Sequence, residues 1–76
     1  MVKKRVILTT HASERMKQRG VSLEDVRITI DSPTQTKRIN KGTQELRRAV
    51  NDKTNVVIVE YKNSGETVVI TTWWEL

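Results

Sequence analysis

With 76 residues and no cysteine, the chain is large enough for one small domain over residues 1–76, which excludes a dinucleotide-binding fold, disulfides and thiolate metal sites. The single histidine argues against a zinc site, and the apolar runs are too short for a membrane helix or a signal peptide, so we expect a soluble, cytoplasmic protein without metal or cofactor. The net charge of +5 lies in two basic blocks, residues 1–20 and 37–48, which indicates a polyanionic partner, either nucleic acid or an acidic protein.

A short helix is predicted near the start of the chain. Residues 5–8 fit either an edge strand or an extended arm that leads into it. The hydroxyl groups of Thr9 and Thr10 are suited to capping a helix over residues 11–19, and Gly20 stands where a left-handed residue commonly ends a helix. The apolar content of this segment is thin.

A second helix has stronger signals at both ends. Ser22 is a favoured N-cap residue, and Asp25 stands at the capping-box position three residues later. The pair Ser32 and Pro33 ends the helix, because proline disfavours helical backbone in the residue before it. We therefore expect this helix to begin after Ser22 and to stop at Ser32.

Beyond Pro33 the sequence pattern changes to that of strands. Residues 34–40 are polar and predict a weak edge strand, while residues 43–50 alternate as in a half-buried strand. The β-branched run at residues 56–59 predicts a central strand covered on both faces, and residues 67–74 predict a final strand. This order predicts an α+β domain in which two N-terminal helices pack on a three- to four-stranded antiparallel sheet, with the other sheet face free for binding.

The densest group of candidate functional residues is His11, Arg15 and Arg19. Their spacing of four residues places an imidazole and two guanidinium groups along one ridge of the first helix. Arginine binds phosphate through two parallel hydrogen bonds, and the ordinary pKa of histidine suits proton transfer near neutral pH. The ridge fits RNA cleavage, in which a base takes the 2′-hydroxyl proton, cations hold the charge on phosphorus and an acid protonates the leaving 5′-oxygen. The alternative is structural: a histidine bound to nearby backbone, and arginines that pair locally or cap the helix end.

Arg47 and Arg48 form a second candidate group. Neighbouring strand residues point to opposite faces, so only one of the two can face the helices. Arg48 shares its face with Leu46 and Val50, which makes it the better candidate for a cleft at the edge of the core and leaves Arg47 to solvent. The alternative is that both arginines are solvated.

The tandem Trp73 and Trp74 form the third group. Tryptophan can stack on nucleic-acid bases, and it can equally fill a small core that has no phenylalanine. Because the two lie on opposite strand faces, we expect one in the core and the other semi-exposed. The candidate RNA contacts are Arg19, Lys37, Arg38, Lys41, Arg47 and Trp74.

The segment from His11 to Val26 also carries a longer motif. It reads His-x-x-x-Arg-Met-x-x-Arg-Gly-Val-Ser-x-Glu-Asp-Val and is followed by a Ser-Pro pair. Further along, Gly42 precedes the arginine pair of a basic strand, and residues 69–73 read Val-Ile-Thr-Thr-Trp. Over nearly its whole length the sequence resembles a small bacterial and archaeal family, domain of unknown function 4258.

This resemblance implies a fold and a chemistry. The family is thought to be similar to RelE- and ParE-like toxins and to the wider barnase–colicin ribonuclease group, in which helices pack on an antiparallel sheet and RNA is cut without metal. Carried over by motif, His11 would be a general acid or base, Arg15 and Arg48 would hold phosphate, and Thr71 would orient the substrate or a proton.

Three functional hypotheses follow. The first is a metal-independent endoribonuclease of toxin type that acts on messenger or ribosome-bound RNA. The second is a non-catalytic module of the same fold that binds RNA or a protein, and the third is a ParE-like inhibitor of a protein target. A toxin would have an acidic or amphipathic antitoxin partner encoded by a neighbouring reading frame. Exposed edge strands or a free tryptophan leave both a monomer and a homodimer open.

Overall fold

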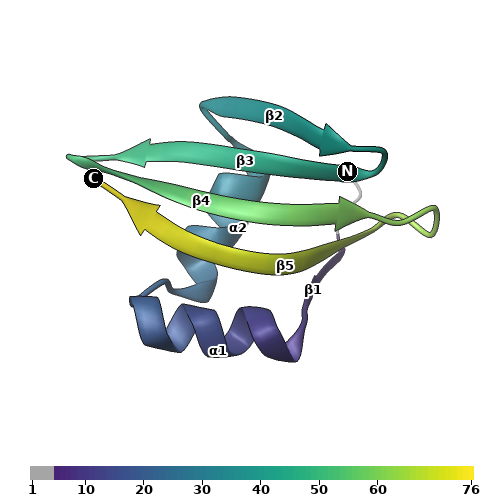
Figure 1. Cartoon of the computed structure of the whole chain (residues 1–76), viewed down its shortest axis with the longest axis horizontal. Coiled ribbons are helices and arrows are strands. Elements are labelled where there is room, and N and C mark those ends of the chain that lie inside the picture. The colour runs from purple at the N-terminus through teal and green to yellow at the C-terminus, as the bar shows by residue number, and fades with distance from the viewer. Residues whose placement is uncertain (1–4) are drawn as a thin grey trace.

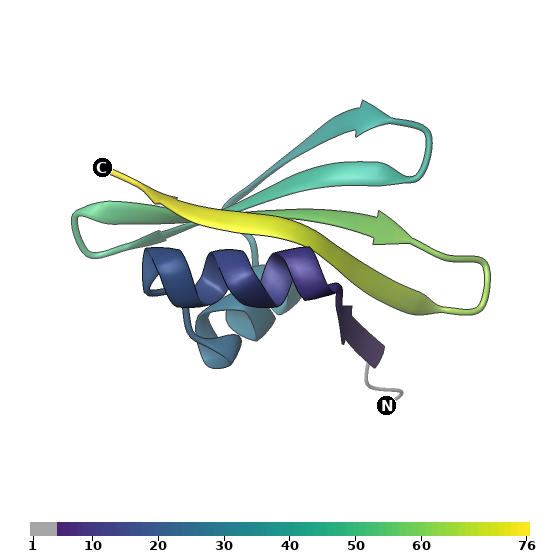
Figure 2. The same cartoon turned by 60° about the horizontal axis from the view of Figure 1, so that its bottom comes forward.

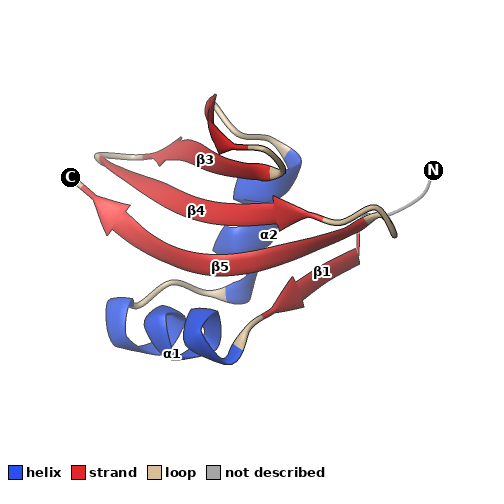
Figure 3. Cartoon of the chain, turned by 45° about the vertical axis from the view of Figure 1, so that its right-hand side comes forward, coloured by secondary structure: helices blue, strands red, loops and turns tan. Residues whose placement is uncertain are grey.

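The computed structural model describes residues 5–76, so Lys3 and Lys4 of the first basic block lie outside the described part. Both helices lie on one face of a single sheet, and no helix of the described chain covers the opposite face, here called the open face (Figure 1, Figure 3). In chain order the elements are β1 (Arg5–Leu8), α1 (Thr10–Arg19), α2 (Leu23–Asp31), β2 (Gln35–Asn40), β3 (Thr43–Val50), β4 (Lys53–Tyr61) and β5 (Glu66–Glu75).

The sheet has five strands of mixed direction, so the predicted three- to four-stranded antiparallel sheet is wrong, although the α+β class fits. The strand order is β1-β5-β4-β3-β2, in which β1 runs parallel to β5 and the other neighbours are antiparallel. The extra strand is the four-residue β1, paired from Arg5↔Glu66 to Leu8↔Val69, so the described chain opens with a strand and not with a helix. A segment this short carries no pattern that shows which distant strand it joins.

Both helices begin and end as the sequence predicts. The Thr9 hydroxyl caps α1 by accepting from a first-turn amide at 3.0 Å, and it donates to the carbonyl oxygen of Val69 at 3.1 Å, which ties the start of α1 to β5. Gly20 closes α1 in the left-handed conformation, with φ of 66°. Ser22 and Asp25 form the reciprocal capping box at the start of α2.

The apolar core lies between the helices and the sheet. Helix α1 contacts β5 and β1, whereas α2 contacts β4 and β3, so each helix covers its own half of the sheet (Figure 1, Figure 3). The prediction of a central strand is confirmed, because β4 lies in the middle of the sheet and Val56, Val57 and Val59 are fully buried. The buried core consists of Ala12, Met16, Val21, Val26, Ile30, Leu46, Val57, Val59 and Val69.

A chain of buried polar side chains fixes α2 on the sheet. Thr29 of α2 donates to Asn55 Oδ1 at 2.8 Å, and Asn55 Nδ2 donates to Thr72 Oγ1 at 3.2 Å. The Thr72 hydroxyl in turn donates to the carbonyl oxygen of Val56 at 2.7 Å. All three side chains are almost fully buried, and each donor and acceptor in this chain has a partner, as burial of polar groups requires.

The two edges of the sheet differ. Strand β2 is exposed at all of its residues, as expected of a weak edge strand, and a bulge between Arg38 and Asn40 interrupts its pairing with β3. The β2–β3 hairpin rises away from the helices (Figure 2). At the other edge, β1 pairs with β5 only as far as Val69. The N-terminal helix therefore lies beside the part of β5 that β1 leaves unpaired.

Candidate nucleic-acid interface

Helix α1 carries the predicted ridge of His11, Arg15 and Arg19, here called the α1 ridge. The apolar stripe of α1 is buried, and each step of four residues moves the ridge about 40° around the helix toward that stripe. Arg19 is therefore the ridge residue nearest the sheet. Its Nη1 donates to the carbonyl oxygen of Thr72 on β5 at 3.2 Å, beyond the stretch of β5 that pairs with β1.

The arginines of the α1 ridge have neutral partners. Arg15 donates through Nε to Nε2 of His11 at 3.4 Å and through Nη1 to Oε1 of Gln18 at 2.9 Å. Arg19 donates to a backbone carbonyl. Among residues 5–76, no carboxylate forms an ion pair with either arginine. The two guanidinium charges are therefore not neutralised by the described part of the chain, and they remain available to an anion.

His11 lies exposed in the first turn of α1. Thr9 supplies the helix cap, so the cap does not depend on the histidine. Its Nε2 accepts the Arg15 hydrogen bond, so this ring nitrogen faces the guanidinium. A group that displaces Arg15 would meet the imidazole at Nε2.

The C-terminal end of α1 adds an aromatic side chain and another cation. Trp74 packs against the core, and its Nε1 donates to the carbonyl oxygen of Gly20 at 3.2 Å. The ammonium of Lys53 lies 4.1 Å from the centroid of the Trp74 ring, a cation–π contact. Trp74 therefore has a packing role, and it holds Lys53 near the end of the α1 ridge. Lys53 was not predicted as a site residue, because its contact with Trp74 depends on the pairing of β4 with β5.

Arg48 faces the helices, as its strand position predicts, but it lies with α2 and not with α1. Its Nη1 donates to the carbonyl oxygen of Ser32 at the end of α2, at 2.6 Å. Because α2 covers β4 and β3 while α1 covers β5 and β1, the structure does not bring Arg48 to the α1 ridge (Figure 1). Arg48 lines a shallow pocket of about 200 Å³ whose other lining residues are Asp25, Ile28, Ala49 and Val50.

Thr71 lies on the open face of the sheet. It pairs with Ile58, whose position on β4 alternates with the valines that face the helices. The sheet therefore separates Thr71 from the α1 ridge. Of the four residues predicted to be catalytic, the structure brings only His11 and Arg15 together.

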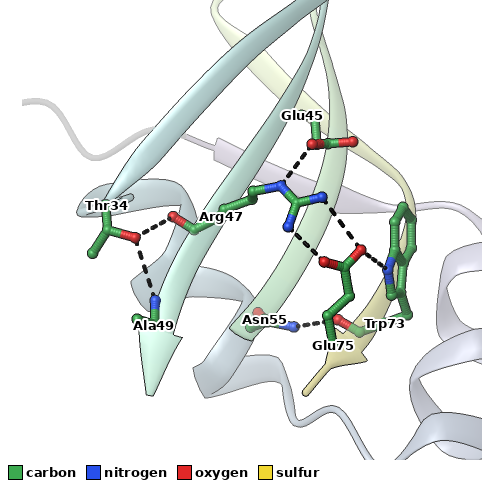
Figure 4. Close-up of polar contacts among 7 residues, drawn as sticks. All are labelled: Thr34, Glu45, Arg47, Ala49, Asn55, Trp73 and Glu75. Carbon is green, nitrogen blue, oxygen red and sulfur yellow. Dashed lines mark hydrogen bonds and ion pairs between the residues drawn. The ribbon is translucent and has the colours of Figure 1, made fainter. Parts of the chain in front are cut away.

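The open face holds an ion cluster that the sequence analysis did not predict. Its members are Glu45, Arg47, Trp73 and Glu75, here called the Arg47 cluster (Figure 4). Arg47 donates to both carboxylate oxygens of Glu75, through Nη1 at 2.6 Å and Nη2 at 3.3 Å. Its Nε donates to Glu45 at 2.8 Å, and Trp73 Nε1 donates to Glu75 at 3.1 Å.

The Arg47 cluster corrects the expectation that Arg47 is solvated, because the side chain is only 29% exposed and is paired with two carboxylates. Hydrogen bonds with Glu75 and Glu45 raise the pKa of Arg47, and those from Arg47 and Trp73 lower the pKa of Glu75. Strand register also places Arg47 and Trp73 on either side of Val56, which is fully buried. The cluster thus covers an apolar side chain that no described helix covers.

The second basic block lies at the edge of the sheet opposite to α1. Lys37 pairs across the strands with Glu45, and Arg38 pairs with Gln44. Lys41 lies in the turn that follows β2, and all three cations are exposed. Since β2 and β1 are the two outer strands, these cations and the α1 ridge form separate surfaces (Figure 1).

Within residues 5–76, none of the helices combines the length and the apolar character needed to cross a membrane. In the same part of the chain, no three side chains of His, Asp or Glu are grouped so that they could hold a metal ion.

Comparison with known proteins supports the family resemblance. The model of one family, described as a domain of unknown function (DUF4258), matches residues 8–74. The matched part contains both helices and the strands β2 to β4, and it includes every residue of the α1 ridge and of the Arg47 cluster except Glu75. No curated protein and no solved structure matches the chain.

Proposed function

This protein belongs to the DUF4258 family, and we propose that it binds RNA through the α1 ridge. One observation carries the proposal: Arg15 and Arg19 are partnered by neutral groups, so their charges are not cancelled by any carboxylate in residues 5–76. A phosphate that replaces a neutral acceptor gives the arginine a partner of opposite charge, and it can accept two parallel N–H groups. The bonds from these arginines to phosphate are therefore stronger than the bonds to neutral acceptors that they replace.

The surroundings of the ridge favour a polyanion over a single anion. Lys17 lies on the other flank of α1, and Lys53 lies at its C-terminal end beside Trp74. Cations spread along the helix match a ligand whose charges are also spread along a chain. Such contacts supply affinity and its salt dependence without selecting a base sequence.

A more specific version of the proposal is that the protein is a metal-independent endoribonuclease related to the RelE- and ParE-like toxins. The contact between His11 and Arg15 favours it, because a proton acceptor and a phosphate-binding cation lie side by side on an exposed surface. In this reaction the 2′-hydroxyl oxygen attacks phosphorus and its proton passes to His11 Nε2. The bond to the 5′-oxygen breaks, the leaving oxygen takes a proton from solvent, and a 2′,3′-cyclic phosphate remains. Arg48 and Thr71 take no part, since they lie on other surfaces.

A toxin of this type would be paired with an antitoxin. The α1 ridge is the surface that an acidic antitoxin segment would cover, since it is the basic surface assigned here to RNA. A gene for an acidic or amphipathic protein beside the gene for this chain, and rescue of growth by its co-expression, would support the toxin assignment. If the chain binds a protein target and no RNA, it is a protein-binding module of the same fold, and it is an inhibitor of the ParE-like kind if binding blocks the activity of that target.

Binding is tested with a single-stranded oligoribonucleotide and the variants Arg15→Gln and Arg19→Gln, alone and combined. Arg27→Gln is the matched control for each single variant, because Arg27 is an exposed arginine on α2 and its loss removes one positive charge, as each single change does. We expect the double variant to bind at least about tenfold more weakly and the slope of log K against log salt to fall by about 1.4, the value for two lost phosphate contacts. If Arg27→Gln weakened RNA binding as much as Arg15→Gln or Arg19→Gln, only net charge would matter, and the α1 ridge would not be the binding surface.

Cleavage is tested with the same RNA in EDTA, first alone and then with ribosomes. A ribonuclease of the kind described leaves 2′,3′-cyclic phosphate ends, and His11→Ala abolishes the cuts while RNA affinity stays within a few-fold of the unchanged protein. If neither condition gives cuts that depend on His11, the protein is a binding module and not an enzyme.

A further inference from the structure

Glu75 occupies the position that an external anion would take in the Arg47 cluster. Three N–H groups converge on this one carboxylate: two from Arg47, at 2.6 and 3.3 Å, and one from the indole of Trp73, at 3.1 Å (Figure 4). A phosphate group presents a similar pair of oxygens to an arginine, and the same fork binds both. The donors therefore form an anion site whose present occupant belongs to the chain itself.

The occupant can be reached and replaced from solvent. The Glu75 side chain is 41% exposed, and it is the last residue of β5. The buried Val56 and the partly buried Trp73 provide apolar and aromatic surface next to the anion site. A nucleotide offers both a phosphate for the arginine and a base that can stack on the indole.

The charge of the cluster depends on Glu75. Lys37 lies across the strands from Glu45, so the neighbourhood holds two cations, Lys37 and Arg47, and two carboxylates. With the Glu75 carboxylate in place these four charges sum to zero. Without it the sum is positive, and the open face then attracts an anion at the point where Arg47 and Trp73 lie.

We infer that the Arg47 cluster is a second phosphate-binding site, closed in the free protein by Glu75 and opened when an RNA backbone phosphate takes the place of that carboxylate. The inference rests on the proposed RNA binding, but it concerns the opposite side of the molecule from the α1 ridge. Arg47 and Trp73 bind the phosphate and the adjoining base, and Glu75 acts as an intramolecular competitor.

The experiment compares Glu75→Gln with Glu60→Gln. Glu60 lies on the same face and pairs with Lys62, so its loss removes the same charge without touching the Arg47 cluster. Two probes are used: the oligoribonucleotide and inorganic phosphate, the latter because it tests the site without assuming RNA binding. The readout is the indole N–H resonance of Trp73, assigned with the help of Trp74→Phe.

We expect Glu75→Gln to bind inorganic phosphate at least about tenfold more tightly than Glu60→Gln, because an intramolecular competitor at millimolar effective concentration is removed. The Trp73 resonance should move on titration, and the gain should vanish when Arg47→Gln is added to Glu75→Gln. Equal phosphate affinity in Glu75→Gln and Glu60→Gln, or a gain that survives the loss of Arg47, overturns the inference.

Three further outcomes are distinguished. If Glu75→Gln does not fold, Glu75→Asp keeps the charge with a side chain one methylene shorter, which weakens its contact with Arg47. A smaller gain for phosphate, still above the affinity of Glu60→Gln, is then expected, while no gain counts against the inference. If phosphate binds Glu75→Gln but the unchanged protein binds no RNA, the anion site stands and the proposed function fails. If RNA binds through α1 but Glu75→Gln has no increased affinity for phosphate, the proposed function stands and the second anion site fails.

Discussion

The α1 ridge and the Arg47 cluster both present arginines at the surface, yet the fold treats them differently. Arg15 and Arg19 donate to an imidazole, an amide and a backbone carbonyl, all neutral. Arg47 donates to two carboxylates. Sequence composition counts these residues alike, but of these two regions only the α1 ridge contributes arginine charges that no carboxylate cancels. The comparison shows that a basic block predicts an anion-binding surface only after internal ion pairs have been subtracted.

The two regions also differ in what lies beneath them. The α1 ridge lies on a helix held to the sheet by the buried side chains of Ala12 and Met16. The Arg47 cluster is itself the cover of Val56. We therefore expect changes at the ridge to affect RNA binding with little effect on stability, and the loss of Arg47 to lower stability.

The largest expected effect is on the support of α1. Met16→Ala should lower the free energy of unfolding by about 2–4 kcal/mol, because it removes buried apolar atoms and leaves a cavity between α1 and the sheet. Urea denaturation followed by circular dichroism measures this loss. A change below about 0.5 kcal/mol would show that α1 is not held to the sheet as described.

The next effect distinguishes the two kinds of arginine by stability. Arg47→Gln should lower the thermal midpoint by a few degrees, because it leaves Glu45 facing Glu75 and uncovers Val56. Arg15→Gln should change the midpoint less, because Arg15 is half-buried but has no ion pair to lose. Equal thermal midpoints for the two variants would show that Arg47 contributes no more to stability than Arg15 does.

A third effect concerns pH. The pKa of Glu75 is lowered in the folded protein, chiefly by its hydrogen bonds with Arg47, so its contribution to stability is full above the ordinary carboxyl pKa of about 4.3. It is lost as the pH falls through the lowered value. The gap in thermal midpoint between the unchanged protein and Glu75→Gln should therefore be constant from pH 7 to about 5 and shrink below about 4. A gap that persists in acid would mean that Glu75 acts through packing and not through its charge.

The smallest effect is expected at Lys17, which lies on α1 outside the ridge. Lys17→Gln should weaken RNA binding less than about threefold and lower the salt slope by no more than about 0.7, the share of one phosphate contact. Fluorescence anisotropy at several salt concentrations gives both values. A loss as large as that of Arg15→Gln would widen the interface to the whole exposed surface of α1.

Local signals predicted much of the fold. The Gly20 cap, the Ser22–Asp25 capping box and the central strand at residues 56–59 each depend on neighbouring residues, and each is confirmed. The parallel pairing of β1 with β5 was not predicted, because it joins segments from the two ends of the described chain. A four-residue strand has too few positions for its hydrophobic pattern to specify a partner.

In the candidate site, too, contacts between residues close in sequence were predicted and contacts between distant strands were not. His11 and Arg15 were predicted to meet because helical spacing is local, and they do. The Arg47 cluster depends on the register of three strands, β3, β4 and β5, and alternation alone could place Glu45 with Arg47 but not with Glu75. Arg48 and Thr71 were grouped with the ridge by family resemblance, and the sheet and α2 keep them apart from it.

The most direct test of the central claim is a titration of the isotopically labelled protein with a single-stranded oligoribonucleotide, followed by backbone amide chemical shifts. With RNA below the protein concentration, the account predicts shift changes concentrated in residues 11–20 and at Lys53, with little change along β2. Changes concentrated in residues 35–41 would place the RNA on the opposite edge of the sheet and contradict the assignment of the α1 ridge. The absence of any change at millimolar RNA would contradict RNA binding itself.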